Sequence, residues 1–78
     1  MSERGAHWNL RLETTDTGRL PERVARRLVT PRIEDGGLVY RGIAAQVPPE
    51  EIVTELRARG LNGAYQVPGG GAGAWIRF

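Results

Sequence analysis

Polar and apolar residues alternate strictly near the start of the chain. Between His7 and Thr14 the apolar positions are Trp8, Leu10 and Leu12, and the positions between them are His7, Asn9, Arg11 and Glu13. A period of two is typical of a β-strand with one buried face. The segment Asp16-Thr17-Gly18 then interrupts the pattern and predicts a turn.

A second pattern occurs twice. Residues 21–28 and 49–56 both read Pro-Glu-x-(Val/Ile)-x-x-x-Leu, and each follows a strand-like run. Proline is favoured in the first turn of a helix, where its missing N–H has no partner to lose. The repeat therefore predicts two strand-then-helix halves that share one core, because one half alone has no second layer against which to bury its apolar face.

The first predicted helix turns Leu20, Val24 and Leu28 inward, with Ala25 beside them, and ends before Pro31. Its outward residues form a basic ridge of Arg19, Arg23, Arg26 and Arg27.

The second predicted helix begins with acidic residues that suit the positive end of the helix dipole. Ile52, Val53 and Leu56 face inward, and Glu55 is spaced to pair with Arg59. Gly60 followed by Leu61 predicts a Schellman stop in which Leu61 packs back on Leu56.

Residues 32–34, a turn at 35–37 and residues 38–47 predict a β-hairpin, because Asp-Gly accepts the backbone angles of a tight turn. The second arm changes parity along its length. A bulge near Gly42 would bring its larger apolar residues to one face and leave Val39, Arg41 and Ala44 on the other. The residues expected on the inner face are Leu38, Tyr40, Ile43, Ala45 and Val47.

The chain ends in a strand at Ala64 to Val67, a flexible glycine-rich loop at 68–73 and a short strand at Ala74 to Phe78. The order predicts an α+β two-layer sandwich with the ferredoxin-like βαββαβ topology and one added C-terminal strand. We expect residues 1–78 to form a single small domain, with residues 1–6 as a disordered tail.

Composition narrows the possible functions. A chain of 78 residues is too small to enclose a deep active-site cavity. It has no cysteine and one serine, so cysteine and serine nucleophiles and the usual structural zinc sites are not expected. His7 is the single histidine and has no second ligand at metal-binding spacing. We expect no enzyme activity, no catalytic residue, no metal and no cofactor.

The basic residues are all arginine, a bias typical of a GC-rich bacterial genome, and the net charge is only +2. No apolar run approaches the roughly 18 residues of a membrane span. The N-terminus lacks the apolar stretch of a signal peptide. We therefore expect a cytoplasmic protein with no membrane partner.

If both helices cover one face of the sheet, the opposite face is left open. We predict that this face or a sheet edge binds a protein partner or a second copy of the chain, as a binding or regulatory module. The predicted contact residues are Arg11, Val39, Arg41, Trp75 and Phe78.

The alternative is a single-stranded nucleic-acid binder, because arginines and an aromatic ring on an open sheet can contact phosphates and stack on bases. Its predicted contact residues are Arg11, Arg41, Trp75 and the ridge formed by Arg19, Arg23, Arg26 and Arg27. The glycine-rich loop 68–73 lacks the following helix and the Gly-Lys-Ser/Thr ending that a nucleotide-binding loop requires.

Overall fold

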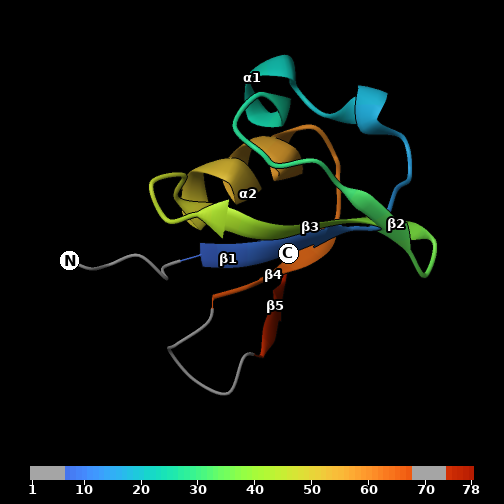
Figure 1. The fold of residues 1–78 in the computed structure, drawn as a ribbon. Helices are drawn as coiled ribbons and strands as arrows, with labels where there is room; N and C mark the ends of the chain where they lie inside the picture. The colour runs from blue at the N-terminus through green and yellow to red at the C-terminus, as the bar shows by residue number, and fades with distance from the viewer. Residues whose placement is uncertain (1–6, 68–73) are drawn as a thin grey trace.

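The computed structural model describes residues 7–67 and 74–78. Its sheet has five strands in the order β2-β3-β1-β4-β5, and each neighbouring pair is antiparallel (Figure 1). The strands are β1 (His7–Leu12), β2 (Arg32–Glu34), β3 (Gly37–Ala44), β4 (Gly63–Gln66) and β5 (Trp75–Arg77). Two helices, α1 (Glu22–Ala25) and α2 (Pro49–Ala58), and a 3-10 turn at Thr17–Arg19 complete the described elements.

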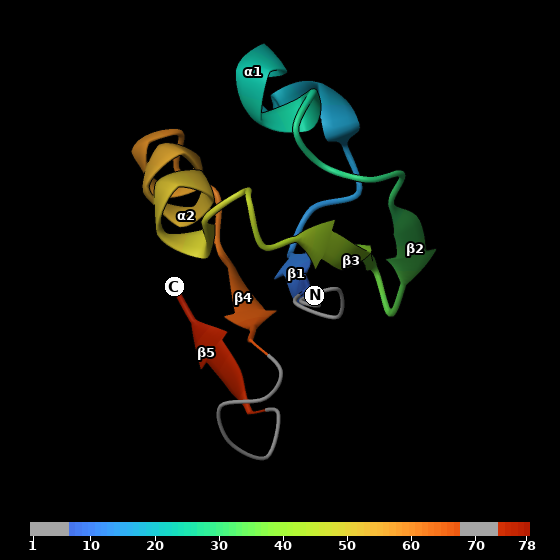
Figure 2. The same ribbon diagram turned by 60° about the vertical axis from the view of Figure 1, so that its left-hand side comes forward.

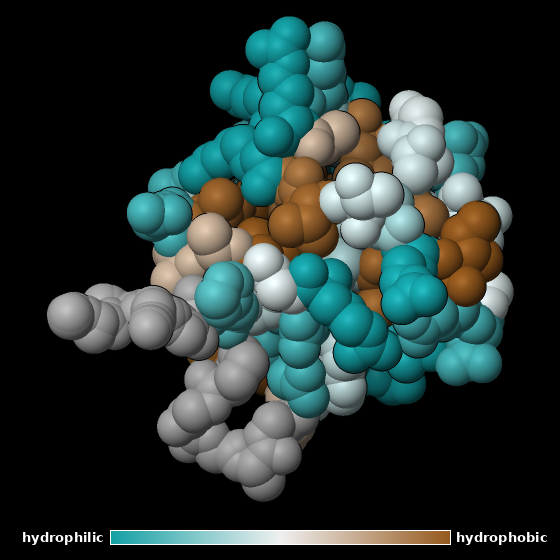
Figure 3. All heavy atoms as spheres, viewed as in Figure 1, coloured by the Kyte–Doolittle hydropathy of each residue, from teal (hydrophilic) through white to brown (hydrophobic). Residues whose placement is uncertain are grey.

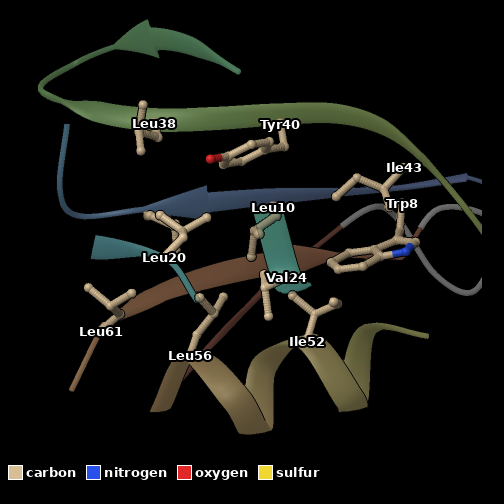
Figure 4. Close-up of a cluster of buried hydrophobic side chains, with 11 residues drawn as sticks. Trp8, Leu10, Leu20, Val24, Leu38, Tyr40, Ile43, Ile52, Leu56 and Leu61 are labelled. Carbon is tan, nitrogen blue, oxygen red and sulfur yellow. The ribbon is translucent and has the colours of Figure 1, made fainter. Parts of the chain in front are cut away.

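Both helices lie on the same side of the sheet (Figures 1 and 2). The core lies between the two layers, where Trp8, Leu10 and Leu12 of β1 share one buried cluster with residues of both helices. Figure 4 shows Val24 from α1 and Ile52 and Leu56 from α2 pointing toward Leu10. The predicted inward face of the first strand is therefore confirmed, as is the shared core of the two repeats.

Trp8 joins β1 to the segment before α2. Its indole Nε1–H donates to the carbonyl of Val47 over 2.7 Å, and its ring meets Tyr65 edge to face at 6.3 Å between centroids. This arrangement satisfies the polar atom of a tryptophan that is otherwise fully buried.

The hairpin and its bulge are confirmed. Glu34 pairs with Gly37 across a turn in which Asp35 and Gly36 have φ of 52° and 76°, the positive values of a type I′ turn. The register of β1 against β3 shifts between Trp8 and Leu10, opposite Gly42, whose φ is 75°. The shift brings Leu38, Tyr40 and Ile43 into the same core, but Ala45 is exposed, because β3 ends at Ala44.

The second helix ends as its sequence predicts. The N–H of Leu61 donates to the carbonyl of Leu56, and the N–H of Gly60 donates to that of Arg57, which together form the Schellman motif. Leu61 is buried in the same cluster as Leu56.

The first helix is shorter than expected, with four helical residues followed by a turn. Leu20 and Val24 are buried and Leu28 is partly buried against the core, as predicted. The inward placement of Ala25 is wrong, because Ala25 is exposed. A helix of little more than one turn presents a narrow apolar stripe, and Ala25 falls outside it.

The added C-terminal strand pairs with β4 at the sheet edge. The molecule is thus a small α+β protein with a five-stranded antiparallel sheet and two helices. No helix among the described residues is long and apolar enough to cross a membrane. The predictions for the tail 1–6 and the loop 68–73 lie outside the described residues.

Candidate binding surface

The side of the sheet opposite the helices is the candidate surface, and we call it the open face. Strand registry places on it the residues that alternate with the core positions. From β3 through β1 and β4 to β5 these include Val39, Arg11, Ala64 and Arg77 in one cross-strand row. Asn9, Gln66 and Trp75 form the neighbouring row.

A hollow of about 540 Å³ lies at one end of the open face. It is bounded by the end of β1, the turn of the β2–β3 hairpin, the start of β4 and the side chains of β5. The side chains that give it chemical character are Arg11, Glu13, Asp35, Trp75 and Arg77. The hollow therefore combines two guanidinium groups, an indole ring and two carboxylates.

Two of the predicted arginines are ion-paired on this face. The Arg11 guanidinium lies 3.4 Å from the Asp35 carboxylate, and that of Arg41 lies 3.2 Å from Glu34. Both pairs reach along the sheet toward the hairpin turn, past Val39. These exposed pairs orient the guanidinium groups but add little stability, about 0 to 1 kcal/mol each.

Val39 lies on the open face, as its position in the strand predicts, but it is only 3% exposed. It lies in the register between Arg11 on β1 and Arg32 on β2, both of which have longer side chains. A partner on the open face would therefore meet the arginines before it met Val39.

Trp75 and Arg77 project from the same side of β5, because they are two residues apart on a strand. The Trp75 side chain is 37% exposed, and Arg77 is exposed with no ion pair among the described residues. Arg77 was not among the residues singled out from the sequence. The alternation within 74–78 is the signal that would have paired it with Trp75.

Phe78 lies on the helix side instead. It packs against the core cluster, and its ring lies 6.4 Å from that of Tyr65. Its N–H donates to the carbonyl of Gly63 over 2.9 Å. The structure thus brings Arg11, Arg41 and Trp75 to the open face and separates Phe78 from them.

The basic ridge on α1 is largely neutralised by acidic residues. Arg26, the residue at the C-terminal cap of α1, pairs with Glu22 at 3.1 Å. Arg23 and Arg27 pair with Glu55 and Glu51 of α2, at 3.3 and 3.2 Å. Glu55 therefore binds an arginine of the other helix and not Arg59, the partner predicted from spacing. Arg19 is exposed on the 3-10 turn that precedes α1.

Asn9 connects three strands on the open face. Its side-chain oxygen accepts from the N–H of Gly42 at the bulge over 3.0 Å, and its amide nitrogen donates to Gln66 over 2.7 Å. The sequence placed Asn9 on this face but gave no sign of this bridge, because Gln66 lies far along the chain.

No group of three or more His, Cys, Asp or Glu residues in the described part of the chain is arranged to hold a metal ion. His7 is exposed at the start of β1. Burial raises the pKa of the Tyr40 hydroxyl above its ordinary value, but this residue belongs to the core and not to the hollow.

Compared with known proteins, the chain matches no protein-family model, no curated protein and no solved structure. The choice of the open face as the candidate surface therefore rests on the structure of this chain alone.

Proposed function

We propose that this chain is a small, non-catalytic binding module that contacts a protein partner through its open face. The observation that carries the proposal is the hollow, where the exposed indole of Trp75 lies on the same face as the guanidinium groups of Arg11 and Arg77. Tryptophan and arginine are, with tyrosine, enriched among the few residues that carry most of the binding energy of protein interfaces.

The chemistry of the hollow indicates the kind of partner. Arg77 forms no ion pair within residues 7–67 and 74–78 and can form a bidentate pair with a carboxylate, and Trp75 offers an apolar surface beside it. Glu13 and Asp35 at the opposite side favour a partner that carries a single acidic group and not an acidic run. An extended segment with one Asp or Glu next to an apolar residue fits these requirements.

Selection of displayed random peptides on the immobilised chain tests the proposal. We expect peptides with an acidic residue beside an apolar one to be enriched. Trp75→Ala and Arg77→Glu should each weaken their binding by about tenfold or more, as for central interface residues.

Arg57→Glu is the matched control, because Arg57 is exposed on α2, on the other side of the sheet. Equal weakening by Arg57→Glu, or unchanged binding in both open-face variants, would contradict the proposal.

A single-stranded nucleic acid is the alternative ligand of the same face, and the exposed Trp75 beside Arg77 favours it. The ion pairs of Arg23, Arg26 and Arg27 count against a contribution from α1, since a phosphate would have to displace a carboxylate from each. Titration with single-stranded DNA and RNA at two salt concentrations separates the two ligands. A nucleic-acid binder requires a steep salt dependence that Arg11→Glu and Arg41→Glu abolish.

We also propose that the first four strands and the two helices form a ferredoxin-like unit to which β5 is added. The order β2-β3-β1-β4, the antiparallel pairing and the placement of both helices on one side support this topology. An experimental structure in which both helical crossovers are right-handed would establish it.

A further inference from the structure

We propose that two copies of this chain associate through the outer edges of their β2 strands, antiparallel about a two-fold axis at Ile33. The association uses none of the residues that give the hollow its chemistry. Its experimental test is therefore independent of the test of the proposed function. Four features of β2 lead to it: its position, its charges, its backbone and its apolar side chain.

The first feature is position. β2 is the terminal strand of the sheet, and its pairing partner β3 covers only one of its two edges. In Figure 2 its other edge faces away from the helices and from the remaining strands. An uncovered edge strand is a template for pairing with another chain.

The second feature is the charge pattern. β2 reads Arg32-Ile33-Glu34, with opposite charges on either side of one apolar residue. An antiparallel pairing centred on Ile33 places Arg32 of each copy opposite Glu34 of the other. Like charges at these positions would oppose pairing, whereas this sequence forms two cross-strand ion pairs.

Glu34 can serve both partners. In the single chain one oxygen of its carboxylate, Oε1, accepts from Arg41 over 3.2 Å. The other oxygen remains for the arginine of the second copy, and the Glu34 side chain is partly exposed. Arg32 is exposed and has no ion pair within the described residues.

The third feature is the direction of the backbone groups. In a hairpin with a two-residue turn, the pair that closes the turn is the hydrogen-bonded one, here Glu34 with Gly37. Backbone groups alternate along an antiparallel strand, so the N–H and C=O of Ile33 point away from β3. Centring the two-fold axis on Ile33 lets each copy donate to and accept from the other.

The fourth feature is an apolar side chain that the single chain leaves uncovered. Ile33 is 67% exposed, the highest value among the large exposed hydrophobic residues in the described part of the chain. Figure 3 shows hydrophobic surface at the right of the view, on the side where β2 lies in Figure 1. Pairing about Ile33 puts this side chain against its own copy, which removes apolar surface from water.

A reciprocal charge exchange tests this geometry. We expect the wild-type chain to be a monomer of 8.6 kDa when dilute and to self-associate reversibly at high concentration, as a short interface implies. Arg32→Glu alone and Glu34→Arg alone should each abolish self-association, because each gives the edge two like charges. An equimolar mixture of the two variants should associate again, since their edges are then complementary.

Light scattering across a concentration series gives the readout, with circular dichroism to confirm that each variant is folded. Wild-type chain that stays monomeric at about 1 mM would overturn the proposal. Failure of the mixed variants to associate would overturn it as well.

The opposite edge of the sheet supplies a matched control. Ile76 is 49% exposed at the centre of β5, which is also a three-residue edge strand. Ile33→Lys should reduce association by about tenfold or more, because an edge lysine opposes strand pairing, while Ile76→Lys should leave it unchanged. The reverse result would assign the contact to β5 and overturn the proposal.

Discussion

The side chain of Asn9 on the central strand β1 forms hydrogen bonds with both neighbouring strands, next to the bulge of β3. Gly42 needs a positive φ at the bulge, and its N–H would lack a strand partner without the side chain of Asn9. The same side chain donates to Gln66 on β4, so one residue of the central strand fixes both neighbours. The bulge in turn keeps Ile43 and Tyr40 in the core, because it corrects the parity of β3.

Replacing Asn9 with alanine should therefore cost more than a surface substitution. We expect Asn9→Ala to lower the free energy of unfolding by about 1 to 3 kcal/mol in total, because it removes two hydrogen bonds that each contribute about 0.5 to 1.5 kcal/mol. Urea denaturation measures the loss. Asn62→Ala is the control, because Asn62 is exposed and its side chain makes no hydrogen bond in the described structure. Equal effects of the two substitutions would contradict the role given to Asn9.

Tyr40 predicts how stability depends on alkaline pH. Burial raises the pKa of its hydroxyl in the folded state, so the folded chain keeps this proton at pH values where the unfolded chain loses it. The unfolded state then binds fewer protons, and stability falls as the pH rises past about 10. Tyr40→Phe should flatten this fall, as measured by urea denaturation at pH 8 and pH 10.5. An unchanged slope would show that Tyr40 does not carry the effect.

At the scale of elements, charge links the two helices. Arg23 lies on α1 and Arg27 lies four residues later in the turn that follows it, and Glu51 and Glu55 lie four apart on α2. The charged residues are evident from the sequence but their pairing is not, because the ion pairs depend on how the two helical segments lie against one another. The predicted Glu55–Arg59 pair was wrong for this reason.

The double substitution Glu51→Gln and Glu55→Gln should lower the stability of the fold only slightly. It should also make the surface around the two helices clearly more positive, because Arg23 and Arg27 lose their partners. We expect a loss of about 0.4 to 2 kcal/mol in total, since exposed pairs contribute 0.2 to 1 kcal/mol each, and less at high salt. Thermal denaturation at low and high salt measures this loss. The freed Arg23 and Arg27 should also increase retention on a heparin column. A large loss of stability that salt does not reduce would mean that these contacts are more than surface pairs.

Local signals determined how well each element could be predicted. The Schellman stop of α2 and the Asp-Gly turn were predictable because each depends on a few adjacent residues with special backbone geometry. The end of α1 was less predictable, since the helix stops at Ala25 without a glycine or proline at that point. Packing of Leu28 against the core, and not a local stop residue, accompanies the change from helix to turn.

At the scale of the whole molecule, the two-layer arrangement follows from the alternation in β1 and from the repeated Pro-Glu helices. These features predicted that one face of the sheet is covered and the other open, and the buried cluster bears out the covered side. The hollow itself could not be predicted, because it joins the ends of β1, β4 and β5 to the hairpin turn. The position of Phe78 was also missed, since the sequence does not indicate toward which layer a terminal residue turns.

The two tryptophans report on the two faces of the sheet. Trp8 is buried in the core and its indole N–H donates to Val47, whereas Trp75 is exposed at the hollow. Their indole N–H signals in a nitrogen–proton NMR spectrum can be followed separately while a selected peptide is added. The central claim, that the open face is the binding surface, predicts that the Trp75 signal shifts with peptide concentration and the Trp8 signal stays in place. Shifts confined to Trp8 and to the amides of α1 and α2 would contradict it.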